Sequence, residues 1–314
     1  MDGLGARAYR LARRLLGGWS WRLANAAATV ISGLRLVDAR REGRPLGVSA
    51  TVITYNDPDW LPVALSSLDE VADEVVIVDS SDPWDETVKV ISDYASGRGN
   101  VRVIRQYPPQ GYAAAREAAL RAARYRYVLV WDSDFAPFRG FAERLREFVG
   151  SYDERRYALV YWPWITLCGD LSHRCRADRY HVEHWMFTHS GSLRYLWDGR
   201  NEYLYAPPYY FRVWLSREPQ GVHLTGVRRP ERVAFKRLAP RVSFYELVRA
   251  RGYQAALEAL REEARREYGT DDLAEVGLRI MREEAAGRPC FDASLLPPEV
   301  VSRAREIGVP LGSC

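Results

Sequence analysis

Short apolar runs alternate with segments of helical periodicity over the first half of the chain. Five runs rich in Val, Ile and Tyr predict buried strands, and after each of the first four, apolar residues recur every three or four positions. The predicted strands are 48–54, 74–78, 101–105, 127–131 and 157–165. Uniformly apolar strands that alternate with helices are typical of a parallel sheet covered on both faces. The pattern therefore predicts an α/β fold.

This alternation ends after the fifth predicted strand. Residues 166–235 are rich in aromatic residues, His and Arg, and predict short strands and loops. The remainder predicts helices over 244–260, 262–267 and 271–284, with a last short helix opened by Pro297 and Pro298. The second half is therefore expected to complete a site and to add a helical extension.

Polar residues follow three of the predicted strands. Thr54 ends the first and Asn56 comes just after it, Asp79 follows the second, and Asp132 and Asp134 follow the fourth. The carboxyl ends of parallel strands meet at one edge of a sheet, where ligands bind. Two carboxylates on a tight turn can hold a hard divalent cation. We therefore expect a ligand site with a metal at this edge.

The composition excludes some classes of protein and of partner. The chain has 314 residues, of which 47% are hydrophobic and 27% charged, a globular mix that excludes wholesale disorder. Its net charge of +4 does not indicate a nucleic-acid partner. The 19 Tyr and 10 Trp could provide aromatic surface for a flat ligand.

The basic residues are concentrated in an N-terminal arm. Residues 1–44 contain nine Arg and three acidic residues, and Leu residues recur at helical spacing between the first Arg residues. Residues 1–40 therefore predict one or two helices, which either lie on an anionic membrane surface or pack on the body of the protein. Arg22 interrupts the apolar stretch, so we expect no signal peptide, and no run reaches the length needed to span a bilayer.

The four cysteines form no C-x-x-C pair and are too few for a disulfide scaffold. We therefore expect reduced thiols and an intracellular compartment. Cysteines and histidines in the aromatic-rich segment raise a zinc hypothesis, which we reject because their spacing fits no known zinc pattern. These residues are Cys168, His173, Cys175, His181, His184 and His189.

Four blocks of this sequence resemble the family 2 glycosyltransferases. They are residues 51–56, 73–80, 111–116 and 130–134, in the order and spacing of that family. A further pattern, His184–Phe187 followed by Trp197–Glu202, resembles the branch that builds lipopolysaccharide-core-like glycans, which usually has His at the position of Asn201. The resemblance implies the GT-A (Rossmann-like) fold, a mostly parallel sheet with helices on both faces.

The resemblance also implies a domain organisation and an activity. The arm would occupy 1–44, the GT-A domain 45–237, and a helical region 238–314. Within the GT-A domain, 45–135 would bind the nucleotide and 136–237 the acceptor. The activity would be metal-dependent transfer of a hexose from a nucleotide-sugar to a hydroxyl of a glycan or a lipid-linked glycan. The expected location is the cytoplasm, at the inner face of the cell membrane if the arm binds lipid.

Carried over position by position, the resemblance assigns roles to the strand-end residues. Thr54 and Asn56 would meet the nucleotide, Asp79 would accept hydrogen bonds from the base or ribose, and Arg116 would lie near the diphosphate or brace the Asp pair. Asp132 and Asp134, with His223 as a third ligand, would bind Mg²⁺ or Mn²⁺. A phosphate clamp would come from Arg228, Arg229 or Arg232.

Structural roles remain open for the same residues. Asp79 could cap the following helix, His223 could be a buried, hydrogen-bonded histidine, and the Arg cluster could be a solvated face. An inverting transfer needs a carboxylate base, for which Glu202 is the first candidate and Glu183 the second. A retaining transfer needs no such base.

Two other functions stay under consideration. One is a non-catalytic relative that binds a nucleotide-sugar or glycan. The other is a sugar-1-phosphate nucleotidyltransferase, which requires a Gly-rich basic loop after the first strand. The acidic run Asn56-Asp57-Pro58-Asp59 argues against that second function.

Overall fold

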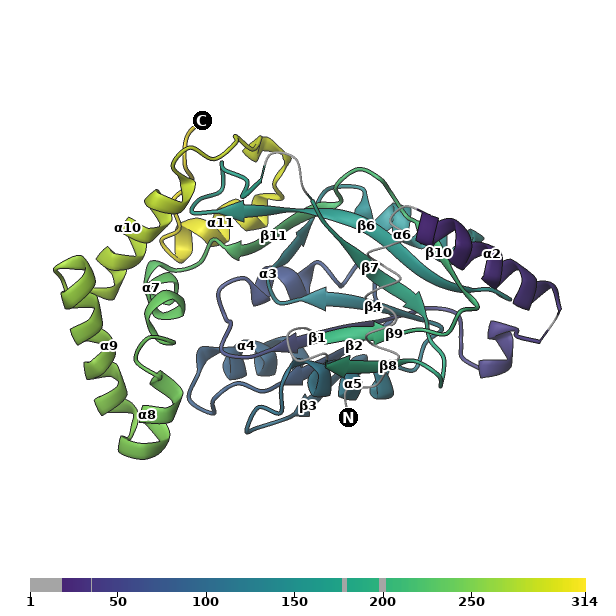
Figure 1. The fold of residues 1–314 in the computed structure, drawn as a ribbon, viewed down its shortest axis with the longest axis horizontal. Coiled ribbons are helices and arrows are strands. Elements are labelled where there is room, and N and C mark those ends of the chain that lie inside the picture. The colour runs from purple at the N-terminus through teal and green to yellow at the C-terminus, as the bar shows by residue number, and fades with distance from the viewer. Residues whose placement is uncertain (1–18, 35, 177–179, 198–201) are drawn as a thin grey trace. The chain divides into compact units, whose positions relative to one another are not determined.

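The computed structural model describes residues 19–34, 36–176, 180–197 and 202–314 (Figure 1). Two compact units are distinguished, and each is described by itself. Unit 1 comprises the described parts of 1–133, 140–163 and 182–218, and unit 2 comprises those of 134–139, 164–181 and 219–314. The first part of the predicted arm, residues 1–18, and Asn201 of the family pattern lie outside the described residues. The domain boundaries expected from the sequence stay predictions.

Unit 1 is built on a parallel sheet in the order β3-β2-β1-β4. These strands are β1 (Val48–Thr54), β2 (Glu74–Asp79), β3 (Val101–Arg105) and β4 (Tyr127–Asp132). β7 (His181–Thr188) pairs antiparallel with β4, and β10 (Tyr210–Trp214) pairs parallel with β6 (Tyr157–Cys168). The fold is therefore mixed α/β, and the predicted parallel strands are confirmed with an antiparallel addition.

The helices between these strands are α3 (Leu61–Ser66), α4 (Glu86–Ala95), α5 (Tyr112–Ala122) and α6 (Phe141–Ser151). Ala115 and Ala119 of α5 pack on Val76 and Val78 of β2, because small side chains let the helix approach the sheet closely. A 3-10 turn, Ala39–Glu42, precedes β1. A small hairpin of β8 (Arg194–Trp197) and β9 (Glu202–Tyr205) is also part of this unit.

Helix α2 (Trp19–Gly33) packs on strand β10. The Trp21 ring stacks on Trp214 with centroids 5.1 Å apart, and the Asn25 side chain exchanges two hydrogen bonds, of 3.1 and 2.8 Å, with the backbone of Arg212. This part of the arm is thus held on the body of unit 1. Leu23 and Val30 on the same helix remain exposed. Of the described helices, none has both the length and the apolar character required to cross a bilayer.

Unit 2 joins β11 (Gly221–Gly226) to the end of β6 in parallel and to β5 (Phe135–Pro137) in antiparallel pairing. Its helices are α7 (Pro230–Leu238), α8 (Phe244–Arg251), α9 (Tyr253–Tyr268), α10 (Leu273–Ala285) and α11 (Pro298–Glu306), with a 3-10 turn at Ala293–Leu295. Figure 1 shows α7 to α10 gathered together. Their buried side chains form a core that includes Ala234, Leu260 and Ile280.

Two expectations for the helical region were wrong. The predicted helix 244–260 is divided at Gly252, whose φ of 86° ends α8, and the predicted helix 262–267 is the second half of α9. Helix α7 falls in a segment expected to contain strands and loops. Pro230 opens it in the first helical turn, where proline is favoured.

The expectation of four reduced thiols was also wrong. Cys168 is bonded to Cys175, and Cys290 to Cys314. The second pair is 24 residues apart in sequence, and the antiparallel bridge between His173 and Cys290 helps to place its first member. Sequence spacing did not reveal this pair because folding, rather than a local motif, brings the two cysteines together.

A buried histidine makes the stability of unit 1 depend on pH. His189 is 2% exposed, its Nε2 donates to the carbonyl of Leu120 at 2.9 Å, and burial lowers its pKa to about 4. Below pH ~6.5, His189 binds a proton in the unfolded chain but not in the folded chain. We therefore expect stability to fall between pH ~6.5 and ~4, by up to about 3 kcal/mol from this group.

Chemical denaturation of the wild-type protein and of His189→Gln across this range measures the effect. Gln keeps an N–H donor but does not titrate, so its profile should be flatter by that amount. Equal pH profiles for the two proteins would contradict the assignment.

Candidate functional site

The carboxyl ends of the parallel strands lie in register at one edge of the unit 1 sheet. Thr54 of β1 is paired with Asp79 of β2, and Asp79 with Arg105 of β3. On the other side of β1, Ile53 is paired with Asp132 of β4. Neighbouring strands are about 5 Å apart, so these strand ends form a continuous polar row. The structure thus brings together the strand-end residues that the sequence singled out.

Asp79 is held firmly in this row. It is 2% exposed, its Oδ1 accepts a hydrogen bond from the Ser81 N–H at 2.9 Å, and its Oδ2 accepts one from the Arg105 guanidinium. Asp79 does not cap α4, since Asp85 does so through the N–H of Thr87 at 2.9 Å. A fixed carboxylate at a strand end can accept hydrogen bonds from a ligand hydroxyl or amine.

The loop after β1 is fixed by Asn56. Its φ of 49° lies in the left-handed region, where Asn is better tolerated than most residues. Its side chain exchanges hydrogen bonds of 2.7 and 2.8 Å with Asp82. Asn56 therefore ties the loop after β1 to the loop after β2. Nearby in sequence, Oγ1 of Thr54 is buried and has no hydrogen-bond partner within the described part of the chain.

Arg116 and Asp132 form an ion pair inside unit 1. Arg116 is on α5 and is 7% exposed, and its Nη2 donates to Oδ1 of Asp132. Burial disfavours the charged guanidinium, but Asp132, Tyr195 and Glu202 outweigh it and raise the pKa of Arg116. Its Nη1 is buried without a partner among the residues described here. The guanidinium thus braces Asp132 and has one buried N–H donor that no described residue accepts.

Asp134 is one of the buried acidic residues of unit 2. Its Oδ1 lies 3.1 Å from Nε2 of His223, and its Oδ2 accepts a hydrogen bond from Nη2 of Arg228 at 2.7 Å. The antiparallel pairing of Phe135 with His223 produces this arrangement, as does the hydrogen bond of 2.9 Å from the Leu224 N–H to the Asp134 carbonyl.

The charges around Asp134 favour its ionised form. Burial alone would raise its pKa, but the charge and hydrogen bond of His223 and the charge of Lys236 lower it. Burial and the charge of Arg232 lower the pKa of Arg228 to about 10, which still leaves it protonated at neutral pH. Arg228 thus binds a carboxylate, whereas Arg229 is the N-cap residue of α7 and Arg232 belongs to its first turn.

Three potential ligand atoms are close together. Asp132, Asp134 and His223 each offer one atom, and the three atoms lie within 4.8 Å of one another. Two carboxylates and an imidazole suit Mn²⁺ or Mg²⁺, with open positions for phosphate oxygens. The donor set therefore fits the divalent ion that the resemblance implies. The cysteines of the zinc hypothesis, Cys168 and Cys175, are bonded to each other.

The two candidate bases, Glu202 and Glu183, lie near a half-buried tyrosine, Tyr195. Burial raises the pKa of Tyr195, and among the charges that act on it are Arg116, Glu183 and Glu202. Glu202 is partly buried and also acts on Arg116, whereas Glu183 is exposed. The backbone N–H of Tyr195 donates to Glu117 of α5 at 2.8 Å, which ties the β8–β9 hairpin to that helix. Glu202 is therefore the carboxylate more closely associated with the Arg116–Asp132 pair.

Sequence reasoning missed two residues of this site. Arg105 ends β3 beside Asp79, and the same strand-end rule that selected Asp79 could have found it. Tyr195 is in the aromatic-rich segment, and no signal in the sequence distinguishes it from the other tyrosines there.

Comparison with known proteins gives one family and several structures. The model of glycosyl transferase family 2 matches residues 49–207, just over half of the chain. The S. aureus TarS 1–349 structure is 18% identical, covers 71% of this chain and 72% of its own, and has a TM-score of 0.39. A second S. aureus TarS structure is 16% identical, with coverages of 71% and 43% and a TM-score of 0.40.

A third solved structure is glucosyl-3-phosphoglycerate synthase from Mycobacterium tuberculosis, in complex with Mn²⁺, uridine diphosphate and glucosyl-3-phosphoglycerate. It is 18% identical, with coverages of 40% and 46% and a TM-score of 0.30. This chain thus spans less than half the length of the second and third structures. No curated protein matches the chain.

Proposed function

We propose that the reaction of this chain requires a divalent metal and inverts the configuration of the transferred sugar. The premise is that the chain belongs to glycosyl transferase family 2 and is a nucleotide-sugar-dependent glycosyltransferase. The acceptor would be a hydroxyl of a glycan or a lipid-linked glycan. The observation that carries the proposal is the group of Asp132, Asp134 and His223, whose ligand atoms lie within 4.8 Å of one another.

The three side chains would hold Mg²⁺ or Mn²⁺. When bound, such an ion neutralises the negative charge that develops on the departing nucleoside diphosphate. Asp134 is oriented for this by His223 and Arg228, and Asp132 by Arg116. A carboxylate whose second oxygen is already bonded loses little side-chain freedom when it binds an ion.

Arg116 would bind the donor diphosphate. Its buried Nη1 has no partner in the described ranges, and an unsatisfied buried donor is costly. A phosphate oxygen would satisfy that donor while Nη2 continues to hold Asp132. Asp79 and Asn56, both fixed by neighbouring groups, would bind the nucleoside at the same sheet edge.

A screen of nucleotide-sugars with purified protein and Mn²⁺ tests the proposal directly. Release of nucleoside diphosphate should require one donor class and the divalent ion, and a chelator should stop it. Binding of a nucleotide-sugar without turnover, with or without an acceptor, would favour the non-catalytic alternative.

Glu202 is the proposed base that accepts the proton of the acceptor hydroxyl. Glu202→Gln should lower kcat by about 10²–10⁴-fold and leave donor binding intact, because general-base catalysis contributes about this much. Glu183→Gln is the matched control and should change kcat less. The ranking is wrong if Glu183→Gln has the larger effect, and base catalysis by either residue is wrong if neither variant slows transfer.

The basic N-terminal segment would add a membrane contact. Leu23 and Val30 of α2 are exposed, and the residues before α2 include four Arg and four Leu, with the Leu at helical spacing. Deletion of residues 1–18 should lower binding to anionic liposomes at least about tenfold while leaving the Trp21 contacts in place. Neutral liposomes are the control, and equal partitioning of both proteins would remove the proposal.

A further inference from the structure

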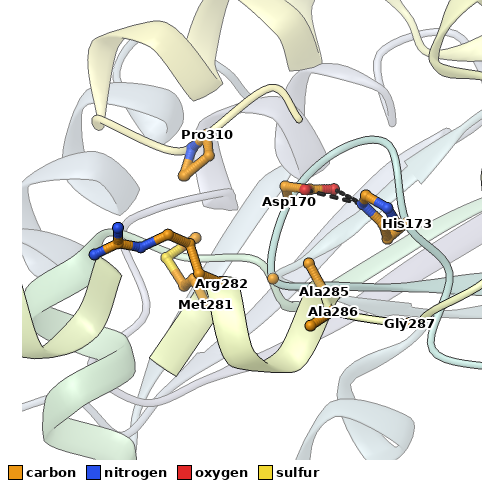
Figure 2. A pocket seen from close by; sticks show the side chains of 9 residues that line it. Asp170, His173, Met281, Arg282, Ala285, Ala286, Gly287 and Pro310 are labelled. Atoms are coloured by element: carbon orange, nitrogen blue, oxygen red, sulfur yellow. Dashed lines mark hydrogen bonds and ion pairs between the residues drawn. The ribbon is translucent and has the colours of Figure 1, made fainter. Parts of the chain in front are cut away.

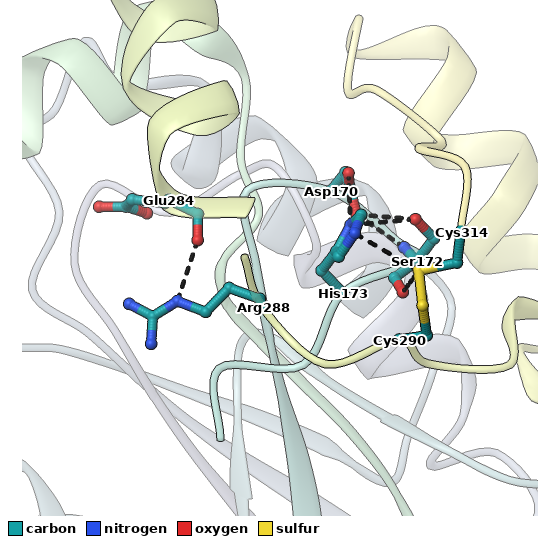
Figure 3. A network of polar contacts seen from close by, with 7 residues as sticks. All are labelled: Asp170, Ser172, His173, Glu284, Arg288, Cys290 and Cys314. Atoms are coloured by element: carbon teal, nitrogen blue, oxygen red, sulfur yellow. Dashed lines mark hydrogen bonds and ion pairs between the residues drawn. A yellow bond between two sulfur atoms is a disulfide. The ribbon is translucent and has the colours of Figure 1, made fainter. Parts of the chain in front are cut away.

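Asp170, His173 and Cys314 form a line of polar contacts in unit 2 (Figure 3). Both carboxylate oxygens of Asp170 lie 2.9 Å from Nδ1 of His173. Nε2 of the same ring lies 3.4 Å from Sγ of Cys314, which is bonded to Cys290. A carboxylate, an imidazole and a sulfur in this order form the arrangement that activates thiols in enzymes.

The loop and the C-terminal tail hold this line in position. The Ser172 N–H donates to Asp170 Oδ1 at 2.8 Å, and the Phe291 N–H donates to the Ser172 carbonyl at 2.7 Å. Gly312 has a φ of 73°, and a Cβ there would lie only 2.2 Å from Oγ of Ser172. The tail therefore rests directly on the Asp170–His173 loop, and only glycine allows that approach.

The two sulfurs of the bridge have different surroundings. Asp170 binds Nδ1, so it directs Nε2 at Sγ of Cys314, and a protonated ring would donate a hydrogen bond to a thiolate there. The Ser172 carbonyl, 3.3 Å from the same Sγ, can accept the S–H of the neutral thiol. Within the described part of the chain, Sγ of Cys290 has no comparable polar contact. The imidazole of His173 therefore gives Cys314 a donor for a thiolate that Cys290 lacks among the described residues, while the Ser172 carbonyl favours the neutral thiol of Cys314.

The bridge is accessible. Cys290 and Cys314 are both exposed, and a cavity of about 220 Å³ borders the imidazole. Figure 2 shows His173 and Asp170 beside this cavity, with Pro310 and Arg282 also among its lining residues. Since Pro310 is four residues before Cys314, the bridge tethers the tail next to this wall.

We propose that the Cys290–Cys314 disulfide is a reversible thiol–disulfide exchange site for a dithiol reductant, with Cys314 as the leaving thiolate. One reductant thiolate attacks Sγ of Cys290, a new S–S bond forms there, and the bond to Cys314 breaks with its electron pair moving to Cys314. His173, held by Asp170, stabilises this thiolate. The second reductant thiol then attacks its partner sulfur and expels Cys290, which takes up a proton. The reductant loses two electrons and is released as its own disulfide.

Alkylation of the fully reduced chain tests this assignment. The protein is reduced with a phosphine, the phosphine is removed, and iodoacetamide is added at pH 7, with labelling of each cysteine followed by peptide mass spectrometry. Cys314 should react at least about tenfold faster than Cys290, because one unit of thiol pKa changes the thiolate fraction about tenfold. His173→Gln and Asp170→Asn should bring the Cys314 rate close to that of Cys290.

Cys168 and Cys175 serve as internal controls, and Arg288→Gln is the matched variant, since Arg288 bonds the Cys175 carbonyl rather than Cys314. If the loop variants perturb folding, Cys290→Ser and Cys314→Ser provide a second test. Each variant leaves one thiol of the pair, and the rates at which the two remaining thiols react with an aromatic disulfide are compared. A Cys290 rate equal to or above that of Cys314, in either measurement, overturns the proposal. An unchanged Cys314 rate in a folded His173→Gln protein also overturns it.

Discussion

Replacement of Asp132 by Asn is expected to abolish metal-dependent sugar transfer, with a fall in turnover of at least about 10²-fold, as is typical when an electrostatic catalytic group is removed. Asp132 is braced by Arg116 and offers a ligand atom within 4.8 Å of those of Asp134 and His223. Asn retains the shape and one acceptor but loses the charge that a hard cation requires.

The measurements are release of nucleoside diphosphate, Mn²⁺ binding and a thermal melt. Mn²⁺ affinity should fall together with turnover, which separates a lost ligand from a misfolded protein. Asp93→Asn is the control, because Asp93 is an exposed member of a helix-surface ion pair with Lys89. Full activity and unchanged Mn²⁺ affinity in Asp132→Asn would contradict the metal-dependent mechanism.

Replacement of Arg228 by Met is expected to give the largest loss of stability. Arg228 is 5% exposed, and its guanidinium is bonded to the equally buried carboxylate of Asp134. Removing one partner of a buried ion pair leaves the other charge buried without a partner, which lowers the free energy of unfolding by about 3–5 kcal/mol. Urea denaturation at pH 7 measures the loss.

Arg237→Met is the matched control for this prediction. Arg237 also belongs to α7 and pairs with Glu284 at 2.9 Å, but its side chain is 45% exposed, so its loss should cost less than about 1 kcal/mol. Equal destabilisation by the two variants would contradict the assigned role of the Asp134–Arg228 pair.

The pH dependence that Asp134 gives to stability has a definite sign, set by His223 and Lys236. The pKa of Asp134 is lowered in the folded protein, so its ionisation stabilises the fold above the ordinary carboxyl pKa of about 3.9. That contribution is lost as the pH falls below this value and through the lowered pKa. We therefore expect the free energy of unfolding of the wild-type protein, measured by urea denaturation, to fall below pH ~3.9 as Asp134 is protonated.

The sheet could be predicted closely because its signals are local. The apolar runs of β1 and β3 have the predicted bounds, 48–54 and 101–105. A buried strand and an amphipathic helix each leave a pattern within ten residues or so. Gly252 illustrates the weakness of the same approach, because the periodicity continues across 244–260 while the backbone breaks there.

The candidate site was predictable in part. Strand order and the rule that parallel strands end at one edge select Asp79 and Asp132, and a family resemblance adds His223 and Glu202. Arg228 was one of three candidates in a cluster, and only the structure shows which of them binds a buried carboxylate. Tyr195 had no sequence signal at all.

The sequence by itself determined the parallel strands, most helices between them and the Asp132-Ser133-Asp134 turn, because side-chain alternation and chain direction dictate them locally. Tertiary structure alone decided that Asp134 binds Arg228, 94 residues away, and that Cys290 is joined to Cys314. Both pairs depend on which surfaces pack together to bury apolar area. For Asp134 and Arg228, burial also requires that each charge has a partner. No pattern within a short segment of the chain records that choice.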